Sequence, residues 1–338
     1  MTDTDSTDNV DSTNSIDITD SMEVEGISDF VVGIDAGGSK TRVVVATLAG
    51  EQLAEVVGPP AAMSPGNAEH SAAVIAALVA SALANAEVGD RLPRALCAGV
   101  AGTGRETEQR DLQDALTRRA VADAVMVETD AQVALSDAFG DGAGIILIAG
   151  TGSIAFGRSP AGAIARCGGW GLAFGDEGSG AWIGRRALSV VAAAHDGREP
   201  ETALTGAILT AAQVNQPEQL IPWAIAADKQ ALGALAPSVV AMAMQDDIRA
   251  NSIIDMAVEE LVLHVRALGK RLFVDDRAAF DVAFTGGLLR KGSLLRKRLE
   301  RRLKTAVPGA TVNAVEIDAA RGAVKLALRC ASISRAAL

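Results

Sequence analysis

The sequence predicts an α/β fold made of two duplicated domains. The chain has 338 residues, 49% of them hydrophobic, which is enough to bury a large core and to form two domains. From Asp29 onward, β-branched apolar runs alternate with stretches of helical periodicity. Each half opens on a glycine-rich hairpin: "VVGIDAGGS" ends at Ser39, and "IILIAGTGS" ends at Ser153, 114 residues later. We interpret this similarity as an internal duplication, with two unrelated hairpins as the alternative.

Periodicity and turn residues predict the elements in chain order. The first half contains strands at 30–36, 41–48, 51–57, 94–99 and 124–129, and helices at 68–87 and 106–120. The second half contains strands at 143–149, 153–158, 161–166 and 281–285, and long helices after residues 176, 247 and 288.

Most of the net charge of -11 lies at the N-terminus. The first 29 residues include nine acidic and no basic side chains. The rest of the chain has 33 acidic side chains (42 minus 9) against 31 basic ones, a net charge of -2. Residues 1–28 are rich in Asp, Ser and Thr and poor in apolar residues, so we expect a disordered acidic tail.

Composition and spacing argue against several classes of protein. The basic cluster at 290–304 has no interleaved aromatic residue, so we interpret it as the solvated face of a helix and expect no nucleic-acid partner. No apolar run reaches the roughly 18 residues of a membrane helix. The acidic N-terminus does not resemble a secretory signal, and we expect a cytoplasmic protein. The three cysteines and three histidines have no ligand spacing, so we expect neither a disulfide framework nor a zinc site.

The first hairpin is predicted to bind phosphate, although it is not a P-loop. In "VVGIDAGGSKTRVVVATL", Gly33 and Gly38 have the P-loop spacing, but Lys40 comes one residue late. A β-branched run follows from Thr41, so the glycines join two strands. Asp35 precedes the turn, where it can hold Mg²⁺ directly or through water. A turn carboxylate bonded to its own backbone is the alternative.

Two such hairpins facing each other would surround a nucleotide with backbone amides. Glycine lets the backbone approach phosphate oxygens because it has no Cβ atom. Ser39, Lys40, Thr151 and Ser153 can add further donors. The pair of hairpins therefore suits a triphosphate.

Acidic residues in the middle of the chain point to chemistry on an alcohol. Asp130 of "VETDAQVALSDA" ends a strand and opens a helix, at the sheet edge where open α/β sheets bind ligands. A helix cap is the alternative role. In "RCGGWGLAFGDEGSGAWIG", a permissive glycine loop around Trp170 precedes Asp176 and Glu177, which are predicted to begin a helix. Together with the phosphate hairpins, these carboxylates suit phosphoryl transfer to a hydroxyl group.

The ordered set of motifs resembles a known family. Its members are "GIDAGGSKT", "SPGN", "GVAGTGRE", "ETDA", "IAGTGS", "CGGWGLAFGDEGSG", "TGGLL" and "RGAVKLAL". From residue 29 to about 330, the chain resembles N-acetylglucosamine kinase-type proteins of the acetate and sugar kinase, actin and heat-shock chaperone superfamily. The same group contains the ATPase activators of 2-hydroxyacyl-CoA dehydratases and of benzoyl-CoA reductase.

The resemblance implies two duplicated actin-like (ribonuclease H-like) domains with a nucleotide cleft between them. The implied parts are the acidic tail at 1–28, an N-terminal actin-like ATPase domain at 29–131, a C-terminal actin-like domain at 132–317, and a C-terminal helix at 318–338 that returns to the N-terminal domain. ATP and Mg²⁺ are the implied cofactors. An amino sugar is the implied partner, and we expect a homodimer without a membrane association.

The resemblance also implies roles for individual residues on the sugar side. Asp130 matches the general base that accepts the proton of the sugar 6-hydroxyl group. Asn67 and Asp176 match residues that hold sugar hydroxyls, and Gly102 lies in a loop near the sugar. Gly169 belongs to the glycine loop on the same side. The segment "LAF" between Gly171 and Gly175 departs from the commoner versions of this loop, which leaves the shape of the sugar pocket open.

On the nucleotide side, Asp35 matches the metal-linked acid of the first loop. Thr151 and Gly152 match the second phosphate loop, and Gly286 with Gly287 matches the adenosine motif. Ser39 replaces a threonine that is frequent in relatives and keeps the hydroxyl group. The full predicted nucleotide set is Gly37, Gly38, Ser39, Lys40, Thr41, Thr151, Gly152, Ser153, Gly286 and Gly287.

Several alternatives stay open. Glucosamine and N-acetylmuramic acid are alternative substrates. A dehydratase activator would need clustered cysteines for an iron–sulfur cluster, and Cys97, Cys167 and Cys330 do not have that spacing. A chaperone-like ATPase has no use for the glycine loop, and a sugar-responsive repressor needs a DNA-binding module. We expect Cys167 to be a small packed side chain, and His195 and His264 to lie on helix surfaces.

Overall fold

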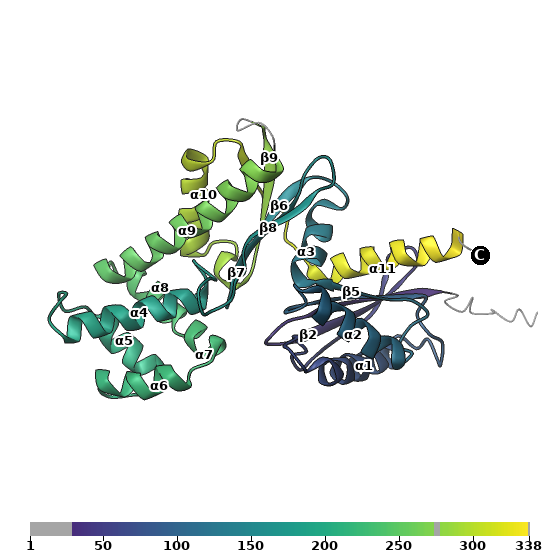
Figure 1. The fold of residues 1–338 in the computed structure, drawn as a ribbon, viewed down its shortest axis with the longest axis horizontal. Coiled ribbons are helices and arrows are strands. Elements are labelled where there is room, and N and C mark those ends of the chain that lie inside the picture. The colour runs from purple at the N-terminus through teal and green to yellow at the C-terminus, as the bar shows by residue number, and fades with distance from the viewer. Residues whose placement is uncertain (1–28, 274–277, 337–338) are drawn as a thin grey trace, which may run out of the picture.

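The computed structural model describes residues 29–273 and 278–336 (Figure 1). The predicted acidic tail at 1–28 lies outside the described residues. The first half contains β1 (Phe30–Ala36), β2 (Thr41–Thr47), β3 (Gln52–Gly58), α1 (Ala68–Asn85), β4 (Ala95–Val100), α2 (Glu106–Arg118), β5 (Val125–Thr129) and α3 (Asp130–Phe139).

The second half begins with a hairpin sheet and continues through a group of helices. Its first elements are β6 (Gly144–Ala149), β7 (Ser153–Arg158), β8 (Ile164–Gly168), α4 (Gly180–His195), α5 (Leu204–Ala211), η1 (Pro217–Gln219), α6 (Leu220–Ala226), α7 (Lys229–Gly233) and α8 (Ala236–Met244). The remaining elements are α9 (Ile248–Leu272), β9 (Phe280–Thr285), η2 (Gly287–Leu289), α10 (Leu294–Ala306), β10 (Ala310–Asn313) and α11 (Ala319–Ala336).

The two five-stranded sheets share one topology. The first has the order β3-β2-β1-β4-β5, and the second, read from its other edge, has the order β8-β7-β6-β9-β10. In each sheet the opening hairpin is antiparallel, and its first strand pairs in parallel with the strand that follows the first helical region. Equal order and equal direction are what a duplicated α/β unit requires, so the predicted fold class is confirmed.

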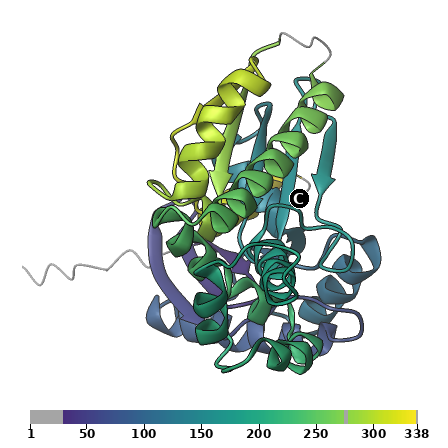
Figure 2. The same ribbon diagram turned by 90° about the vertical axis from the view of Figure 1, so that its left-hand side faces the viewer.

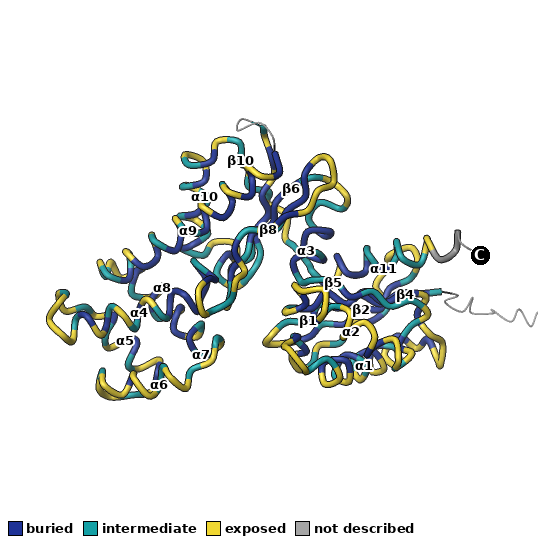
Figure 3. Tube along the Cα trace, viewed as in Figure 1, coloured by how far each residue is buried: buried dark blue, intermediate teal, exposed yellow. Residues whose placement is uncertain are grey.

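Helices cover both faces of the first sheet. α1 and α2 pack on one face, around Phe30, Ile34 and Leu96, and α11 lies across the other face (Figure 1). The second sheet is covered by α4, α9 and α10, and α3 lies between the two sheets (Figures 1 and 2). Figure 3 shows the resulting burial, with buried strands inside and exposed residues on the outer helices. Because β4 is buried at all six positions, it is covered on both faces.

Two glycines let the C-terminal helix α11 approach the backbone of β1 and of α3 closely. A Cβ atom on Gly33 of β1 would meet the backbone of Val324, and a Cβ atom on Gly322 of α11 would meet the carbonyl of Val133 in α3. Glycine at these two positions permits contact distances that no other residue allows. The C-terminal helix is therefore held against both β1 and α3.

The predicted strands are found within about one residue of their expected starts, with one exception. The strand expected at 161–166 is β8 at Ile164–Gly168, because residues 159–163 form a turn in which Ala163 N donates to Ser159 Oγ over 3.0 Å. The sequence analysis missed β10, which has only four residues and pairs with β9 at the sheet edge. Short edge strands carry too few residues for a periodic signal.

The helix predicted from residue 176 was placed too early. Residues 176–179 form a turn, and α4 begins at Gly180 with Ser179 as its N-cap: Ser179 Oγ accepts a hydrogen bond from Trp182 N over 3.2 Å. The helix predicted after residue 288 begins at Leu294, capped by Ser293. The helices α5 to α8 were missed, because their apolar residues are not separated by clear helix boundaries.

Among the described residues, one helix is long and apolar enough to cross a membrane by length and composition. This helix is α1, whose sequence nevertheless contains Glu69 and His70. Its buried side includes Ala72, Ile75 and Val79, which pack in the apolar core on one face of the first sheet. The helix covers one face of the first sheet.

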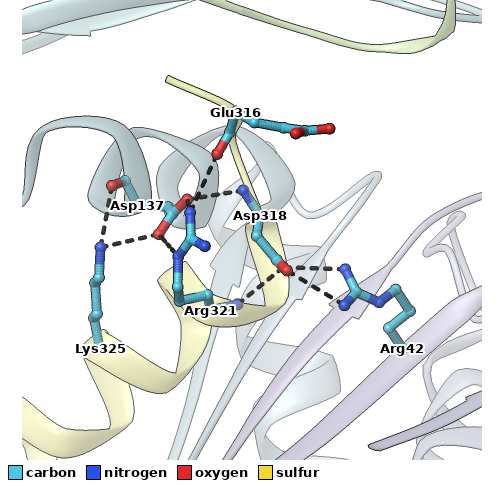
Figure 4. Close-up of polar contacts among 6 residues, drawn as sticks. All are labelled: Arg42, Asp137, Glu316, Asp318, Arg321 and Lys325. Atoms are coloured by element: carbon cyan, nitrogen blue, oxygen red, sulfur yellow. Dashed lines mark hydrogen bonds and ion pairs between the residues drawn. The ribbon is translucent and has the colours of Figure 1, made fainter. Parts of the chain in front are cut away.

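A buried carboxylate joins α3 to α11 (Figure 4). The side chain of Asp137 is fully buried, and it accepts hydrogen bonds from Arg321 Nε at 2.7 Å, Lys325 Nζ at 2.9 Å and Asp318 N at 2.8 Å. Burial alone would raise the pKa of Asp137, but these donors lower it below its ordinary value. Asp318 also accepts hydrogen bonds from Arg42 of β2, so one chain of polar contacts joins α3, α11 and the first hairpin.

The substitution Asp137→Asn should lower the free energy of unfolding by about 2–3 kcal/mol at neutral pH, because it removes charge-assisted hydrogen bonds from a buried site. Since the pKa of Asp137 is lowered in the folded state, the difference should shrink as the pH falls through that pKa. Urea unfolding at several pH values measures the effect. The exposed Asp141, which pairs with Arg329, supplies the control Asp141→Asn, with a loss below about 1 kcal/mol. Equal losses in the two variants would contradict the assignment.

Candidate active site

The first hairpin exposes a tight glycine turn at one edge of the first sheet. Gly37 N donates to Lys40 O over 3.0 Å and closes the turn, and residues 38–40 are exposed. Gly38, Ser39 and Lys40 are thus available to a ligand. Thr41, which was also predicted to bind nucleotide, is fully buried, and its hydroxyl has no hydrogen-bond partner among the described residues.

The second hairpin has a similar turn, and it is braced by α4. Gly150 N donates to Gly152 O over 2.9 Å, while Gly180 N of α4 donates back to Gly150 O over 2.8 Å. Thr151 is exposed at the tip. Ser153 is buried, and its hydroxyl donates to the carbonyl of Glu177 over 2.6 Å. Ser153 therefore joins the hairpin to the segment before α4.

The turn after β9 lies beside this second hairpin. Gly286 has φ +98°, and a Cβ atom there would meet the backbone of Ala149 at the end of β6. Glycine is required by both the conformation and the close approach. Gly287 faces open space. The two glycines thus form an open backbone surface next to the second hairpin.

Asp130 lies at the start of α3, at the end of β5. Thr129 is the N-cap of this helix, since its Oγ1 accepts a hydrogen bond from Gln132 N over 3.0 Å. The capping role considered for Asp130 is therefore filled by its neighbour. Asp130 Oδ1 accepts a hydrogen bond from Ala131 N at 2.9 Å. Burial raises the pKa of Asp130, and the amide of Ala131 and the charge of Lys229 oppose that rise.

Asp35 lies close to Asp130 at the same sheet edge. It occupies the end of β1, next to β4. Burial raises the pKa of Asp35 to about 6, and the negative charge of Asp130 adds to the effect, while Arg42 opposes it. A carboxylate with a raised pKa and an acidic neighbour gains from a cation. Mg²⁺ commonly uses one or two carboxylates together with substrate phosphates and water, so Asp35 fits such a site.

Asn67 and Gly102 come together at this edge as well. The side chain of Asn67 accepts a hydrogen bond from Ser64 N at 2.8 Å and donates to Ala62 O at 3.3 Å, which shapes the turn before α1. Gly102 has φ +92° and follows β4, and a Cβ atom there would meet the carbonyl of Met63 in the same turn. The two loops therefore lie in direct contact.

Asp176 combines backbone strain with an unsatisfied carboxylate. It has φ +58° and is only 3% exposed. Its Oδ2 lies 2.8 Å from Lys229 Nζ, but the ion pair lacks the direction of a hydrogen bond, and Oδ2 accepts no hydrogen bond from any described residue. Strained residues and orphaned buried polar atoms concentrate at functional sites. Asp176 Oδ2 is therefore suited to accept a hydrogen bond from a hydroxyl group of a ligand.

The glycine loop before Asp176 has a left-handed backbone and an exposed aromatic tip. Gly168 and Gly169 have φ +76° and +69°. Trp170 is 59% exposed and Phe174 is 72% exposed. The centroids of their rings lie 6.2 Å apart. The guanidinium group of Arg166 lies 4.5 Å from the Trp170 ring. These aromatic side chains are thus surface features of the loop and not part of the core.

His264 is buried beneath this loop, which corrects the expectation that it lies on a helix surface. It projects from α9 toward Gly168, and its Nε2 lies 3.6 Å from Glu177 Oε2. Burial lowers the pKa of His264, and the charge of Glu177 opposes the change. His195 is exposed and pairs with Glu218. Cys167 is half-buried against the main core of the second half.

The short helix α7 was not predicted, and it joins the two halves. Asp228 caps the helix by accepting a hydrogen bond from Ala231 N at 2.8 Å. The side chain of Gln230 donates to the carbonyl of Gly38 in the first hairpin, and Lys229 lies against Gly152 of the second hairpin. The only sequence signal is an Asp before a short helical stretch, which says nothing about this position in space.

A separate hollow of about 620 Å³ opens between α4 and α9, away from these residues. Its lining includes Asp246, Asp255, Glu259 and Glu260, along with Trp182 and Met256. In the part of the chain that the structure describes, the hollow has no glycine turn of the kind that approaches phosphate oxygens, and Asp255 and Glu259 in it are paired with Arg298 and Arg302. The sheet edge that carries Asp35 and Asp130 is therefore the better candidate, because it combines glycine turns with converging carboxylates.

Comparisons with known proteins show the family and agree with the fold. The sequence signature of the BadF/BadG/BcrA/BcrD ATPase family matches residues 32–327. The chain is 31% identical to an N-acetylmuramic acid/N-acetylglucosamine kinase of Clostridium acetobutylicum, over 88% of this chain and 98% of that protein. It is 29% identical to an N-acetyl-D-glucosamine kinase of Dictyostelium discoideum, over 89% of this chain and 98% of that protein. A solved structure of a putative N-acetylglucosamine kinase from Chromobacterium violaceum has a TM-score of 0.74 at 28% identity, covering 89% of this chain and 99% of that one.

The raised pKa of Asp35 predicts a pH-dependent stability in metal-free buffer. The folded state binds this proton more tightly than the unfolded state, so ionised Asp35 lowers the free energy of unfolding above about pH 6, and the penalty disappears as the pH falls toward 3.8. Asp35→Asn should therefore stabilise the protein at pH 8 by up to about 3 kcal/mol, since one pKa unit corresponds to about 1.4 kcal/mol.

Thermal unfolding in EDTA between pH 4 and 8 measures this gain, with the exposed Asp90→Asn as the matched control. The gain should be largest at pH 8 and should fade below pH 6. A constant difference across the pH range, or a destabilised variant at pH 8, would be inconsistent with a raised pKa at Asp35.

Proposed function

Because the chain belongs to the BadF/BadG/BcrA/BcrD ATPase family, we propose that it is an ATP-dependent kinase of amino sugars that phosphorylates the 6-hydroxyl group of N-acetylglucosamine. The observation that carries the proposal is the convergence of Asp35 and Asp130 at the sheet edge between two glycine turns. The names of the relatives, which are kinases of N-acetylglucosamine and N-acetylmuramic acid, support the class of substrate.

The glycine turns are suited to hold the phosphates of ATP. The tips at residues 38–40 and 151 are exposed, and glycine allows the backbone to approach phosphate oxygens. The open turn at Gly286 and Gly287 lies next to the second hairpin, where it can accept the adenosine. Asp35 is the residue that would hold Mg²⁺, which neutralises phosphate charge when it is bound.

The sugar lies on the other side of the phosphates in this proposal. Asn67 and the loop at Gly102 form one wall, and Asp176 forms another. The buried Oδ2 of Asp176 accepts no hydrogen bond from the described residues, so a sugar hydroxyl satisfies it. A hydroxyl-bearing ligand is favoured at such a site because a buried carboxylate oxygen that accepts no hydrogen bond is costly.

Asp130 is the general base of the proposed reaction. The sugar oxygen forms a bond to the γ-phosphorus while the bond from that phosphorus to the β–γ bridging oxygen breaks. The hydroxyl proton goes to Asp130, and ADP leaves. The pKa of Asp130, raised by burial, brings the carboxylate closer to the basicity that proton transfer at neutral pH requires. The base does not need to be strong, because positioning and charge neutralisation supply most of the rate.

Glucosamine and N-acetylmuramic acid are the alternative substrates, and a dehydratase-activator ATPase is the alternative function. The activator chemistry needs clustered cysteines. Cys97 and Cys330 lie in the apolar cluster under α11, and Cys167 lies in the other half of the molecule. This distribution favours the kinase.

Asp130→Asn should lower kcat by roughly 10²–10⁴-fold, because it removes the proton acceptor and keeps the shape. Binding of a non-hydrolysable ATP analogue should stay within about threefold of wild type, since the phosphates contact the hairpins. Steady-state kinetics and titration calorimetry measure the two quantities. The exposed Asp114→Asn on α2 serves as the control. Near-normal turnover in Asp130→Asn would reject Asp130 as the base.

A substrate panel tests the sugar itself. We expect N-acetylglucosamine to give the highest kcat/KM in a coupled ADP-release assay, ahead of glucosamine, N-acetylmuramic acid and glucose. Phosphorus NMR of the product should locate the phosphate on the 6-hydroxyl group. A clear preference for another amino sugar would replace the substrate and keep the enzyme class. ADP release without any phosphorylated sugar would reject the kinase.

A further inference from the structure

Lys229 occupies the point where the proposed catalytic parts meet. Its Nζ lies 2.8 Å from Asp176 Oδ2. The same ammonium group fills the space that a Cβ atom on Gly152 would take at the second hairpin. Its positive charge also acts on Asp130, where it opposes the rise in pKa caused by burial. The ammonium group therefore lies next to Asp176 on the proposed sugar side and next to Gly152 on the proposed phosphate side. It is also close enough to affect the pKa of Asp130, the proposed base.

The position of Lys229 is fixed by its neighbours on α7. Asp228 caps the helix, and the side chain of Gln230 bonds to Gly38 of the first hairpin. The far end of α7 packs on α4, where a Cβ atom on Gly184 would meet the carbonyl of Leu232. The helix is thus held between both hairpins. Lys229 projects from its first residue toward the turn at Gly152.

The charges of the site require a cation at this point. Asp35 and Asp130 are carboxylates at one edge of the first sheet, Asp176 adds a third from the segment before α4, and a triphosphate adds further negative charge. Arg42 is already paired with Glu55 and Asp318, at 2.9 and 3.0 Å. Lys40 lies on the exposed first turn. Lys229 is the ammonium group that lies against the second turn at Gly152.

The ion pair of Lys229 can be exchanged. The side chain of Lys229 is 42% exposed, whereas that of Asp176 is 4% exposed. Lys229 can therefore move away from Asp176 without leaving a buried position. The pair also lacks hydrogen-bond direction, as Asp176 Oδ2 accepts none from the described residues. Water screens a half-exposed ion pair and keeps it weak.

We propose that Lys229 is a catalytic residue that leaves Asp176 to contact the γ-phosphoryl group of ATP, which frees Asp176 to bind a sugar hydroxyl. The inference rests on the proposed kinase function. The lysine adds no bond to the reaction: it neutralises charge on the phosphoryl oxygens while the phosphoryl group moves from the bridging oxygen of ADP to the sugar oxygen. A cation supplied at this position stabilises the transition state in other phosphoryl transfers.

Titration calorimetry on the full chain tests the contact without any sugar. Lys229→Met should bind Mg²⁺·AMPPNP at least about tenfold more weakly than wild type, while its affinity for Mg²⁺·ADP should change less than about threefold, because only the triphosphate carries the γ-phosphate. Lys229→Arg should recover most of the lost affinity. Lys297→Met, which removes an exposed lysine of α10, should match wild type for both nucleotides.

Kinetics separate this role from a purely structural one. With an amino sugar, Lys229→Met should lower kcat by roughly 10²–10³-fold and leave the KM for the sugar within about threefold. If Lys229 only held Asp176 in place, the KM for the sugar would rise, and AMPPNP would bind as tightly as in wild type. That result, or an equal loss of AMPPNP and ADP affinity, would overturn the proposal.

Folding and the enzyme class are controlled separately. Circular dichroism and thermal unfolding establish that Lys229→Met is folded, and Lys229→Gln provides a second, polar variant for the same nucleotide comparison. If wild type phosphorylates none of the sugars offered, the kinase proposal fails by itself. The difference between AMPPNP and ADP in the two variants still decides whether Lys229 contacts the γ-phosphate.

Discussion

The buried carboxylate of Asp137 determines where α3 lies, and much of the site depends on α3. Asp137 is about two turns from Asp130 along the same helix. Arg321 and Lys325 of α11 bind it from one side, and the backbone of Asp318 completes the set. Because a buried charge is costly unless its partners are in place, α3 has one favourable position. The helix that carries the proposed base is thereby fixed to the C-terminal helix.

The rest of the site follows from the ends of parallel strands. β1, β4 and β5 run in parallel, so the residues after them meet at one edge of the first sheet. Ala101 N donates to Ala36 O over 2.9 Å, which joins the segment that follows β4 to the last residue of β1. The second sheet repeats this arrangement with its own glycine turn. α7 is the addition that breaks the symmetry, since it comes from the helical group of one half and contacts both hairpins.

The sequence predicted the parts that depend on local pattern. The first strands of both hairpins, β1 and β6, are continuous apolar runs, and both hairpins were found within about one residue of their predicted positions. The parts that depend on tertiary contacts were missed or misplaced. Lys229 has no local signature, and its importance comes from Gly152 and Asp176, which are distant in sequence. His264 has helical spacing but faces the glycine loop. In "GDEGSG", the acids suggested a helix start, whereas Ser179 is the residue that caps α4.

Asp176 differs from the other non-glycine residues with positive φ, because its left-handed backbone has no helix end to explain it. Among the described residues, five other than glycine have positive φ, and four of them occupy the second position after a helix: Glu87, Ala120, Gln213 and Asp246. At that position a left-handed residue satisfies the last carbonyl groups, so the conformation has a local cause. Asp176 follows no helix and precedes α4. Its buried carboxylate lies against Lys229, and the N-cap of α4 is Ser179. A strained acid without a helix-capping role is typical of functional sites, which is the basis for the sugar-binding role proposed for Asp176.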